Sequence, residues 1–352
     1  MTWMIYGANG YTGRLVAALA VQRGHRPVLA GRDELQLAEL ADRLGLEHRA
    51  FPLPNPARLR DGLTGIDAVA HCAGPFSPTS RAMVDACLAT GAHYVDITGE
   101  IDVLEAVLAR AAEAREAGIA LLPGSGFDVV PTDCLAAMVV ERLPDATALD
   151  IAFRAGGGMS PGTARTSVEG LVSGGRARID GNIVSVPIGW RRRTADFAPG
   201  TVTVTSIPWG DVSTAFHSTG VPDIVTYTQL PGGGATSVAQ KLTGPAMKIP
   251  GVRRVLAGAV HRRVTGPDEA RRNRSSSQVF VEARSAEGRV VTGSLTTPNG
   301  YLLTADSVVR VMDRVLAGSV PAGAHTPSQA HGPTFVLELD GVTLNGITEV
   351  PG

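Results

Sequence analysis

The chain opens with a short apolar run that is followed at once by three glycines at regular spacing. The apolar run is Trp3–Tyr6, and the glycines are Gly7, Gly10 and Gly13. A helical pattern of apolar residues then continues over Arg14–Arg23. A strand, a glycine-rich turn and a helix start in this order are typical of the first unit of a nucleotide-binding α/β sheet.

The glycine spacing alone is a weak signal, because the chain has 42 glycines among 352 residues and such triplets also arise by chance. The apolar strand before the glycines and the helix after them strengthen it. Backbone N–H groups at a helix start can bind the pyrophosphate of a dinucleotide. The residues predicted to contact this cofactor are Gly7, Asn9, Gly10, Tyr11, Thr12 and Gly13.

Strand and helix patterns alternate over residues 1–145, and this predicts an α/β Rossmann domain with a doubly wound parallel sheet. The expected strands are Trp3–Tyr6, Pro27–Ala30, His48–Phe51, Ala68–Cys72, His93–Ile97 and Ile119–Leu122. The expected helices are Arg14–Arg23, Glu34–Leu44, Thr79–Thr90, Val103–Ala117 and Thr132–Arg142, while Pro54–Leu63 is ambiguous. Ligands of such sheets bind beyond the carboxyl ends of the strands.

After residue 145 the pattern changes to frequent strands separated by glycine and proline. This predicts an α+β domain over residues 146–300 with a mixed or antiparallel sheet, suited to substrate binding or dimerisation. Its expected strands are Leu149–Arg154, Arg192–Phe197, Thr201–Ser206, Ile224–Gln229, Val279–Ser285 and Arg289–Thr296. Val252–Val264 is predicted to be helical and Ser275–Ser277 a loop. Residues 301–352 are expected to form a helix, at Ala305–Leu316, and a strand that pack back on the first domain.

The composition excludes several classes of protein. A net charge of −1 does not favour a nucleic-acid partner. The cysteines, Cys72, Cys87 and Cys134, lack metal-ligand spacing, so we expect free thiols and no metal site. We find neither a secretory segment nor an apolar run long enough to span a membrane, and we therefore expect a cytoplasmic protein with no integral membrane segment.

The end of the second expected strand indicates which nucleotide binds. An acidic residue there selects NAD through the 2′-hydroxyl, whereas an arginine accommodates the 2′-phosphate of NADP. Gly31 stands at the position of the acid and Arg32 follows it. Asp33 could replace the acid, but it is better placed to cap the helix that begins at Glu34. The sequence therefore favours NADP(H).

Three later segments follow predicted strand ends on the cofactor side. The residues predicted to line the nicotinamide end are Cys72, Ala73, Gly74, Pro75, Phe76, Ser125, Gly126 and Phe127. The acids predicted to act in catalysis are Glu100, Asp96 and Asp128. Structural roles compete with these predictions, since Asp96 can bind local backbone and Glu100 can interact with a helix dipole. For Asp133 an N-cap role is the expectation.

Taken together, these motifs resemble the saccharopine-dehydrogenase-like oxidoreductases, a group that includes the mycobacterial trans-acting enoyl reductases. The matching motifs are Gly7-Ala-Asn-Gly-Tyr-Thr-Gly-Arg14, Ala73-Gly-Pro-Phe76, His93-Tyr-Val-Asp-Ile-Thr-Gly-Glu100, Gly124-Ser-Gly-Phe-Asp128 and Pro131-Thr-Asp133, with weaker matches at Gly162-Thr163, Ile207-Pro-Trp-Gly210 and Thr326-Pro-Ser-Gln329. The resemblance implies a Rossmann domain, NADP(H) and a second α+β domain. It leaves the substrate open.

We therefore expect an NADPH-dependent reductase that transfers hydride to an activated double bond of a small-molecule or carrier-bound acyl substrate. The double bond would belong to an enoyl thioester, an imine or a ketone of a lipid, polyketide or specialised metabolite, and the protein is a possible homodimer. The alternatives are a saccharopine-type amine dehydrogenase or imine reductase, and a non-catalytic NADP-binding sensor or assembly protein. The only lysines, Lys241 and Lys248, lie outside the matched motifs. The basic segment Arg253–Arg274 contacts either an anionic partner or only solvent.

Overall fold

The computed structural model describes residues 1–163, 174–229 and 266–350. The chain divides into two compact units. The first consists of Met1–Cys134 and Gly300–Gly341, and the second of Leu135–Asn299 and Val342–Gly352. The predicted helix Val252–Val264, both lysines and most of the basic segment lie outside the described residues.

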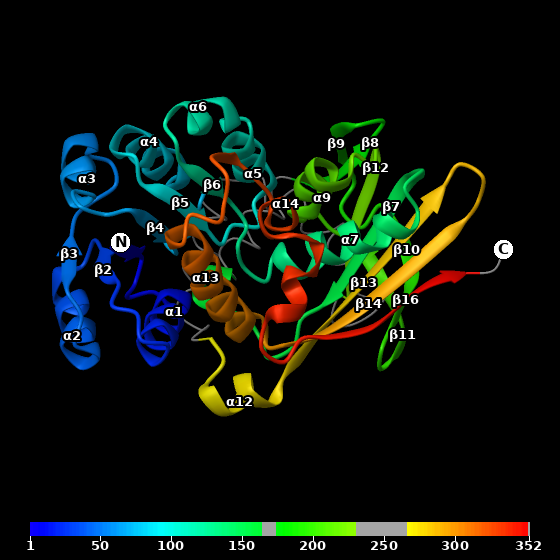
Figure 1. Cartoon of the computed structure of the whole chain (residues 1–352). Coiled ribbons are helices and arrows are strands. Elements are labelled where there is room, and N and C mark those ends of the chain that lie inside the picture. Colours follow the sequence, from blue (N-terminus) through cyan, green and yellow to red (C-terminus); the bar gives the residue numbers. More distant parts are fainter. Residues whose placement is uncertain (164–173, 230–265, 351–352) are drawn as a thin grey trace. The chain divides into compact units, whose positions relative to one another are not determined.

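The first unit contains a seven-stranded sheet in which every pair of neighbouring strands is parallel (Figure 1). The strands are β1 Trp3–Tyr6, β2 Val28–Gly31, β3 His48–Ala50, β4 Ala68–His71, β5 His93–Asp96, β6 Ala120–Leu122 and β15 Gly323–Ala324. Their order is β15-β6-β5-β4-β1-β2-β3. The chain therefore runs outward in one direction from β1 and then returns to begin the other half at β4. This arrangement confirms the predicted doubly wound parallel sheet and puts the switch point between β1 and β4.

The helices of this unit lie between its strands or flank them in the sequence. They are α1 Tyr11–Gln22, α2 Glu34–Leu44, α3 Pro56–Gly62, α4 Ser80–Thr90, α5 Ile101–Leu108, α6 Ala111–Glu116, α13 Gly300–Leu316 and α14 Pro327–His331, with a 3-10 turn at Pro333–Glu338, and α7 Val130–Arg142 leads into the second unit. The prediction of one helix over Val103–Ala117 is wrong, because the chain leaves helical geometry at Ala109–Arg110. α13 begins five residues before the predicted Ala305. It packs against α1.

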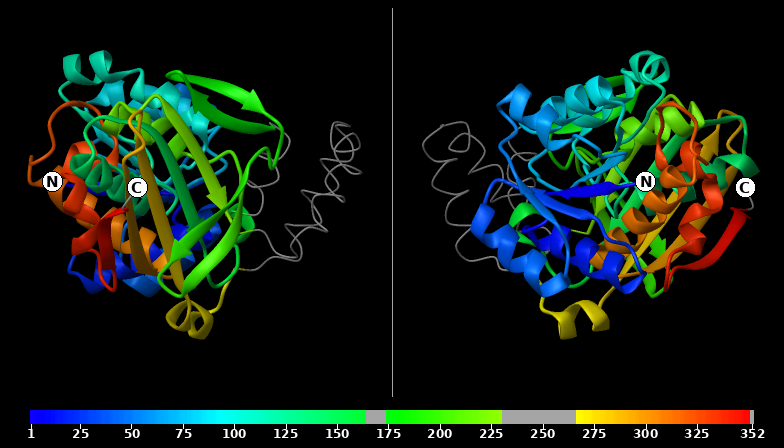
Figure 2. Two further views of the ribbon diagram at one scale, coloured as in Figure 1. Left: turned by 90° about the vertical axis from the view of Figure 1, so that its right-hand side faces the viewer. Right: turned by 60° about the vertical axis from the view of Figure 1, so that its left-hand side comes forward.

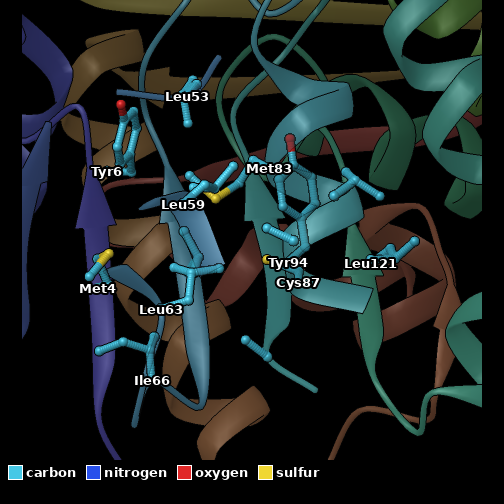
Figure 3. Packing of buried hydrophobic residues seen from close by; sticks show 14 of the residues in the cluster. Met4, Tyr6, Leu53, Leu59, Leu63, Ile66, Met83, Cys87, Tyr94 and Leu121 are labelled. Atoms are coloured by element: carbon cyan, nitrogen blue, oxygen red, sulfur yellow. The ribbon is translucent and has the colours of Figure 1, made fainter. Parts of the chain in front are cut away.

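Apolar side chains from the sheet and its helices form the core of the first unit (Figure 3). Members from β1, β5 and β6 are Met4, Tyr6, Tyr94 and Leu121, and members from the α3 and α4 regions are Leu59, Leu63, Met83 and Cys87. All of these are at most 1 % exposed. Burial of this many apolar side chains fixes the sheet, so that the loops at its carboxyl edge start from rigid positions.

The second unit contains a mixed sheet, as predicted (Figure 2). Its strands are β7 Ala146–Arg154, β8 Gly175–Ile179, β9 Asn182–Val186, β10 Arg192–Phe197, β11 Gly200–Ser206, β12 Asp223–Thr228, β13 Ser276–Ser285, β14 Val290–Pro298 and β16 Thr343–Val350. The main path runs β10-β11-β12-β7-β13-β14-β16, and β8 pairs with both β12 and β9. β12 and β7 are parallel, whereas the other pairs are antiparallel.

Two helices of the second unit, α9 Asp211–Thr219 and α12 Glu269–Arg274, were not predicted. The prediction of a loop at Ser275–Ser277 is wrong for its last two residues. Ser276 pairs with Pro298 and Ser277 with Thr297, so β13 starts directly after α12. The backbone hydrogen bonds of the long β13–β14 hairpin outweigh the weak strand propensity of serine.

Candidate functional site

The glycine-rich loop after β1 is too closely packed to accept side chains. Gly7 has a φ of +86°, and its N–H donates to the Ala30 carbonyl at 2.8 Å. A Cβ at Gly13 would lie 2.3 Å from the Gly7 oxygen. Gly10 precedes α1, and no side chain caps that helix. The loop therefore holds an uncapped helix start beside small residues, which is the form that binds a pyrophosphate.

The end of β2 carries the residues that face the adenosine side of such a site. Arg32 is exposed, and its charge acts on Tyr6 in β1, where it partly opposes the effect of burial, which raises the pKa of Tyr6 to about 12. A Cβ at Gly31 would lie 3.2 Å from Oδ1 of Asn9, so the Asn9 side chain reaches toward this strand end. Asp33 accepts a hydrogen bond from the Gln36 N–H at 3.1 Å. This confirms Asp33 as the cap of α2 and leaves Arg32 as the charged group suited to a 2′-phosphate.

The loop after β4 is held in shape by a hydroxyl. Thr79 Oγ1 lies 3.0 Å from the Ala73 carbonyl oxygen and 2.9 Å from that of Pro75. It also lies 3.1 Å from Nε2 of His71. The Thr79 hydroxyl has one proton, which points to the two carbonyl oxygens, and its oxygen is left to accept a hydrogen bond from His71. On this assignment His71 carries its proton on Nε2. Burial lowers the pKa of His71 to about 3, so the ring stays neutral. The sequence analysis did not identify His71 or Thr79 as residues that shape this loop.

The predicted cofactor contacts in this loop differ in exposure. Phe76 is 7 % exposed and belongs to the hydrophobic core, with its ring 5.4 Å from that of His71. The Cys72 N–H donates to the Tyr6 carbonyl at 2.7 Å. Burial, with the charge of Asp96, raises the pKa of the Cys72 thiol to about 12, so it stays protonated. Ala73 and Gly74 offer backbone and small side chains to a ligand.

Glu100 ties two of the predicted segments together. Its Oε1 accepts the Phe76 N–H at 2.7 Å, and its Oε2 accepts the Ser77 N–H at 2.8 Å. Both N–H groups favour the ionised carboxylate. The arrangement makes Glu100 a clamp between the loop after β4 and the start of α5.

Asp96 is fully buried at the end of β5. Its Oδ1 accepts the N–H groups of Thr98 at 2.9 Å and Gly124 at 2.8 Å. Its Oδ2 accepts the Tyr94 hydroxyl at 2.7 Å. Burial raises the pKa of Asp96 to about 6 against these hydrogen bonds, which favour the charged form. The carboxylate thus organises the ends of β5 and β6.

Asp128 has a different environment. It is half-buried after β6, where its Cβ lies 2.9 Å from the position that a Cβ at Gly99 would take. Burial, followed by the charge of Glu100, raises the pKa of Asp128 to about 7. A carboxyl group with this pKa can deliver a proton at neutral pH. Among the three predicted acids, Asp128 therefore has the properties of a general acid.

The start of α13 supports the segment after β6. Thr304 Oγ1 accepts the Phe127 N–H at 2.9 Å, and a Cβ at Gly300 would meet the Phe127 ring at 2.8 Å. The Ser125 hydroxyl donates to the Leu122 carbonyl at 3.0 Å, so it serves the loop itself. A Cβ at Gly126 would lie 3.0 Å from Thr304. These contacts come from the turn of α13 that the sequence prediction omitted.

α13 also contacts the glycine-rich loop region through an aromatic side chain. The Tyr301 ring lies 4.8 Å from that of Tyr11 in the predicted cofactor loop, in an edge-on arrangement.

Asp133 does not cap α7, because it lies inside the helix and its Oδ2 accepts the Ser328 N–H at 2.8 Å. The N-cap prediction for Asp133 is therefore wrong.

Within the described ranges there is no group of histidine, cysteine and acidic residues that could hold a metal ion. No helix in the described part of the chain is long and apolar enough to cross a membrane.

Comparison with known proteins identifies the first unit. Residues 3–122 match the family model of the saccharopine dehydrogenase NADP binding domain. The trans-acting enoyl reductase of Mycobacterium ulcerans is 30% identical over 138 residues, which are 37% of this chain and 33% of that protein. A saccharopine dehydrogenase-like oxidoreductase of Mus musculus is 29% identical over 150 residues, 37% of this chain and 35% of that protein. The chain thus matches about a third of the length of these relatives.

The whole fold also has a solved counterpart. The apo saccharopine dehydrogenase (L-Glu forming) of Saccharomyces cerevisiae superimposes with a TM-score of 0.64 at 13% identity, over 99% of this chain and 100% of that one. At this identity the likeness concerns the fold. The comparisons show that residues 3–122 form an NADP-binding domain of the saccharopine dehydrogenase type, and the similarity to the two oxidoreductases covers about this part of the chain.

Proposed function

We propose that the protein is an NADPH-dependent reductase in which Asp128 donates the proton. The proposal depends on one observation above all: a half-buried carboxyl group with a pKa of about 7 lies at the end of β6, in the half of the sheet that starts at β4. In a doubly wound sheet the second half serves the nicotinamide end of the dinucleotide. A proton donor is needed there when hydride adds to a polarised double bond.

When bound, NADPH supplies the hydride. The atom that gains negative charge as the hydride adds then takes the proton from Asp128: the α-carbon of an enoyl thioester, the nitrogen of an imine or the oxygen of a ketone. Asp128 is left ionised and takes up a proton from solvent before the next turnover. This sequence balances the two-electron reduction of one double bond.

The other two predicted acids have supporting roles in this proposal. Both oxygens of Glu100 accept backbone N–H groups, and those of Asp96 accept three hydrogen bonds in full burial. Both carboxylates are engaged by hydrogen bonds within the protein. Their negative charges shape the loops, and that of Glu100 also helps to keep Asp128 protonated.

For the substrate we favour an acyl compound, either free or bound to a carrier. The support is the similarity to a trans-acting enoyl reductase, which covers the nucleotide domain.

The experiment is NADPH oxidation, followed by absorbance, over a panel of enoyl thioesters, imines and ketones. Asp128→Asn should lower kcat by at least about 100-fold, the usual contribution of a general acid. Asp42→Asn is the matched control, because Asp42 is an exposed acid on α2. Unchanged turnover in Asp128→Asn would exclude Asp128 as the donor. NADPH binding without reduction of any acceptor would favour the sensor alternative.

A further inference from the structure

A polar cavity that is open to solvent is lined entirely by residues of the second unit. It has a volume of about 590 Å³ and is lined by residues of β7, β10, β12 and β13 and by the segment just before β10. Its size is in the range of ligand sites. Its lining is mostly charged, so filling it with an apolar ligand would remove ionic groups from water without compensation. The cavity therefore suits a charged ligand.

The floor of the cavity neutralises its own charges. Asp150 pairs with Arg193 and, at 2.8 Å, with Arg284. Glu282 pairs with the same two arginines. The Tyr227 hydroxyl donates to Oδ1 of Asp150 at 3.0 Å. Two carboxylates and two guanidinium groups leave this floor with no net charge.

The rim adds two positive charges that the floor does not balance. Arg191 and Arg192 line the cavity, and neither forms an ion pair within the part of the chain that the structure describes. The Arg191 guanidinium lies 4.1 Å from the centre of the Trp190 ring, a cation–π contact that orients it. Its charge lowers the pKa of Tyr227 on the floor, against the effect of burial, so it acts within the cavity. The lining as a whole therefore carries a charge of +2.

We propose that this cavity is an anion site that binds a doubly charged phosphate group through Arg191 and Arg192. Guanidinium groups bind phosphate oxygens in pairs, through parallel N–H donors. The ion-paired floor would keep Arg193 and Arg284 in fixed positions while the two rim arginines close on the ligand. The inference does not rest on the proposed reductase activity, since it concerns other residues and a binding equilibrium.

The test is calorimetric titration of the full chain with inorganic pyrophosphate at low ionic strength. The variant Arg191→Gln/Arg192→Gln is compared with the wild type and with Arg43→Gln/Arg142→Gln, which removes the same charge from exposed positions on α2 and α7. The glycine-rich loop, which also binds pyrophosphate in this account, is identical in all three proteins. A difference between the Arg191→Gln/Arg192→Gln variant and the control therefore reports on the cavity.

The rim variant should lose about tenfold in affinity, with the control within about twofold of the wild type. Equal binding by the wild type and the rim variant would overturn the proposal, and so would an equal loss in the control. Titration with coenzyme A and dephospho-coenzyme A then distinguishes the source of the phosphate. If the wild type prefers coenzyme A to dephospho-coenzyme A and the rim variant does not, the ligand is a phosphomonoester on a larger molecule. If the wild type binds pyrophosphate through the rim arginines but does not prefer coenzyme A, the ligand is a free oxyanion.

Discussion

Replacing Asp128 with asparagine is expected to stabilise the protein at neutral pH while it removes activity. The reason is the pKa of about 7 for a carboxyl group whose ordinary value is 3.8. As pH rises, the unfolded chain releases this proton near 3.8, whereas the folded chain retains it until about 7. The wild type therefore loses stability between these two values, and the loss is complete above the folded pKa. An asparagine side chain has nearly the same shape but does not ionise, so the variant does not lose stability in this way.

The magnitude follows from that window. Each pH unit between the two pKa values costs the folded wild type up to about 1.4 kcal/mol. Between pH 5 and pH 8 the upper limit is therefore about 3 kcal/mol, and because Asp128 is only half-buried we expect about 1–2 kcal/mol. The variant should gain this much relative to the wild type on moving from pH 5 to pH 8.

The assay is urea unfolding of the wild type, Asp128→Asn and Asp42→Asn at pH 5, 6, 7 and 8. The difference between Asp128→Asn and the wild type should grow up to pH 7 and then level off, while Asp42→Asn should show no such trend. A difference that does not change with pH, or a variant that is less stable at pH 8 than at pH 5 relative to the wild type, would refute the raised pKa.

Substitutions at three further positions test the nucleotide loops. Arg32→Ala should weaken NADPH binding by about 10- to 150-fold and leave NADH binding unchanged, as measured by fluorescence titration; equal losses for both would contradict a contact with the 2′-phosphate. Gly13→Ala puts a Cβ 2.3 Å from the Gly7 oxygen, so NADPH binding should be lost and the melting temperature lowered, and an unaffected variant would show that the loop is not tightly packed. Thr79→Val should cost about 1–3 kcal/mol in urea unfolding, because it leaves the buried Nε2–H of His71 without its acceptor, and Thr79→Ser should restore most of this; full stability in Thr79→Val would refute the assigned tautomer.

The sequence predicted the first unit well because its signals are local. A buried strand such as Trp3–Tyr6 and an amphipathic helix such as Glu34–Leu44 are each encoded by adjacent residues. The Asp33 cap is equally local, since its partner Gln36 lies three positions away. The alternation of strands and helices predicted a parallel sheet of six strands, but neither the strand order nor the seventh strand, β15, was predicted.

The rest of the site depends on contacts between distant residues. Thr304 supports Phe127 across 177 positions, and the Ser328 N–H that reaches Asp133 lies 195 positions away. No periodic pattern indicates such pairs. The extra turn of α13 carries Gly300, which has poor helix propensity, and it is stabilised by tertiary packing instead. The environments of the three acids were equally hidden, because the burial of Asp128 and the N–H groups that meet Asp96 and Glu100 arise only in the folded protein.

In the proposed reaction, hydride passes from NADPH to an activated double bond beside Asp128. The measurement is mass spectrometry of the product formed from NADPH deuterated at the transferable position and the acceptor that turns over fastest in the panel. We expect one deuterium on the carbon that accepts hydride, and we expect Asp128→Asn to slow its appearance by at least about 100-fold. A product without deuterium, or labelling at the wild-type rate in the variant, would contradict it.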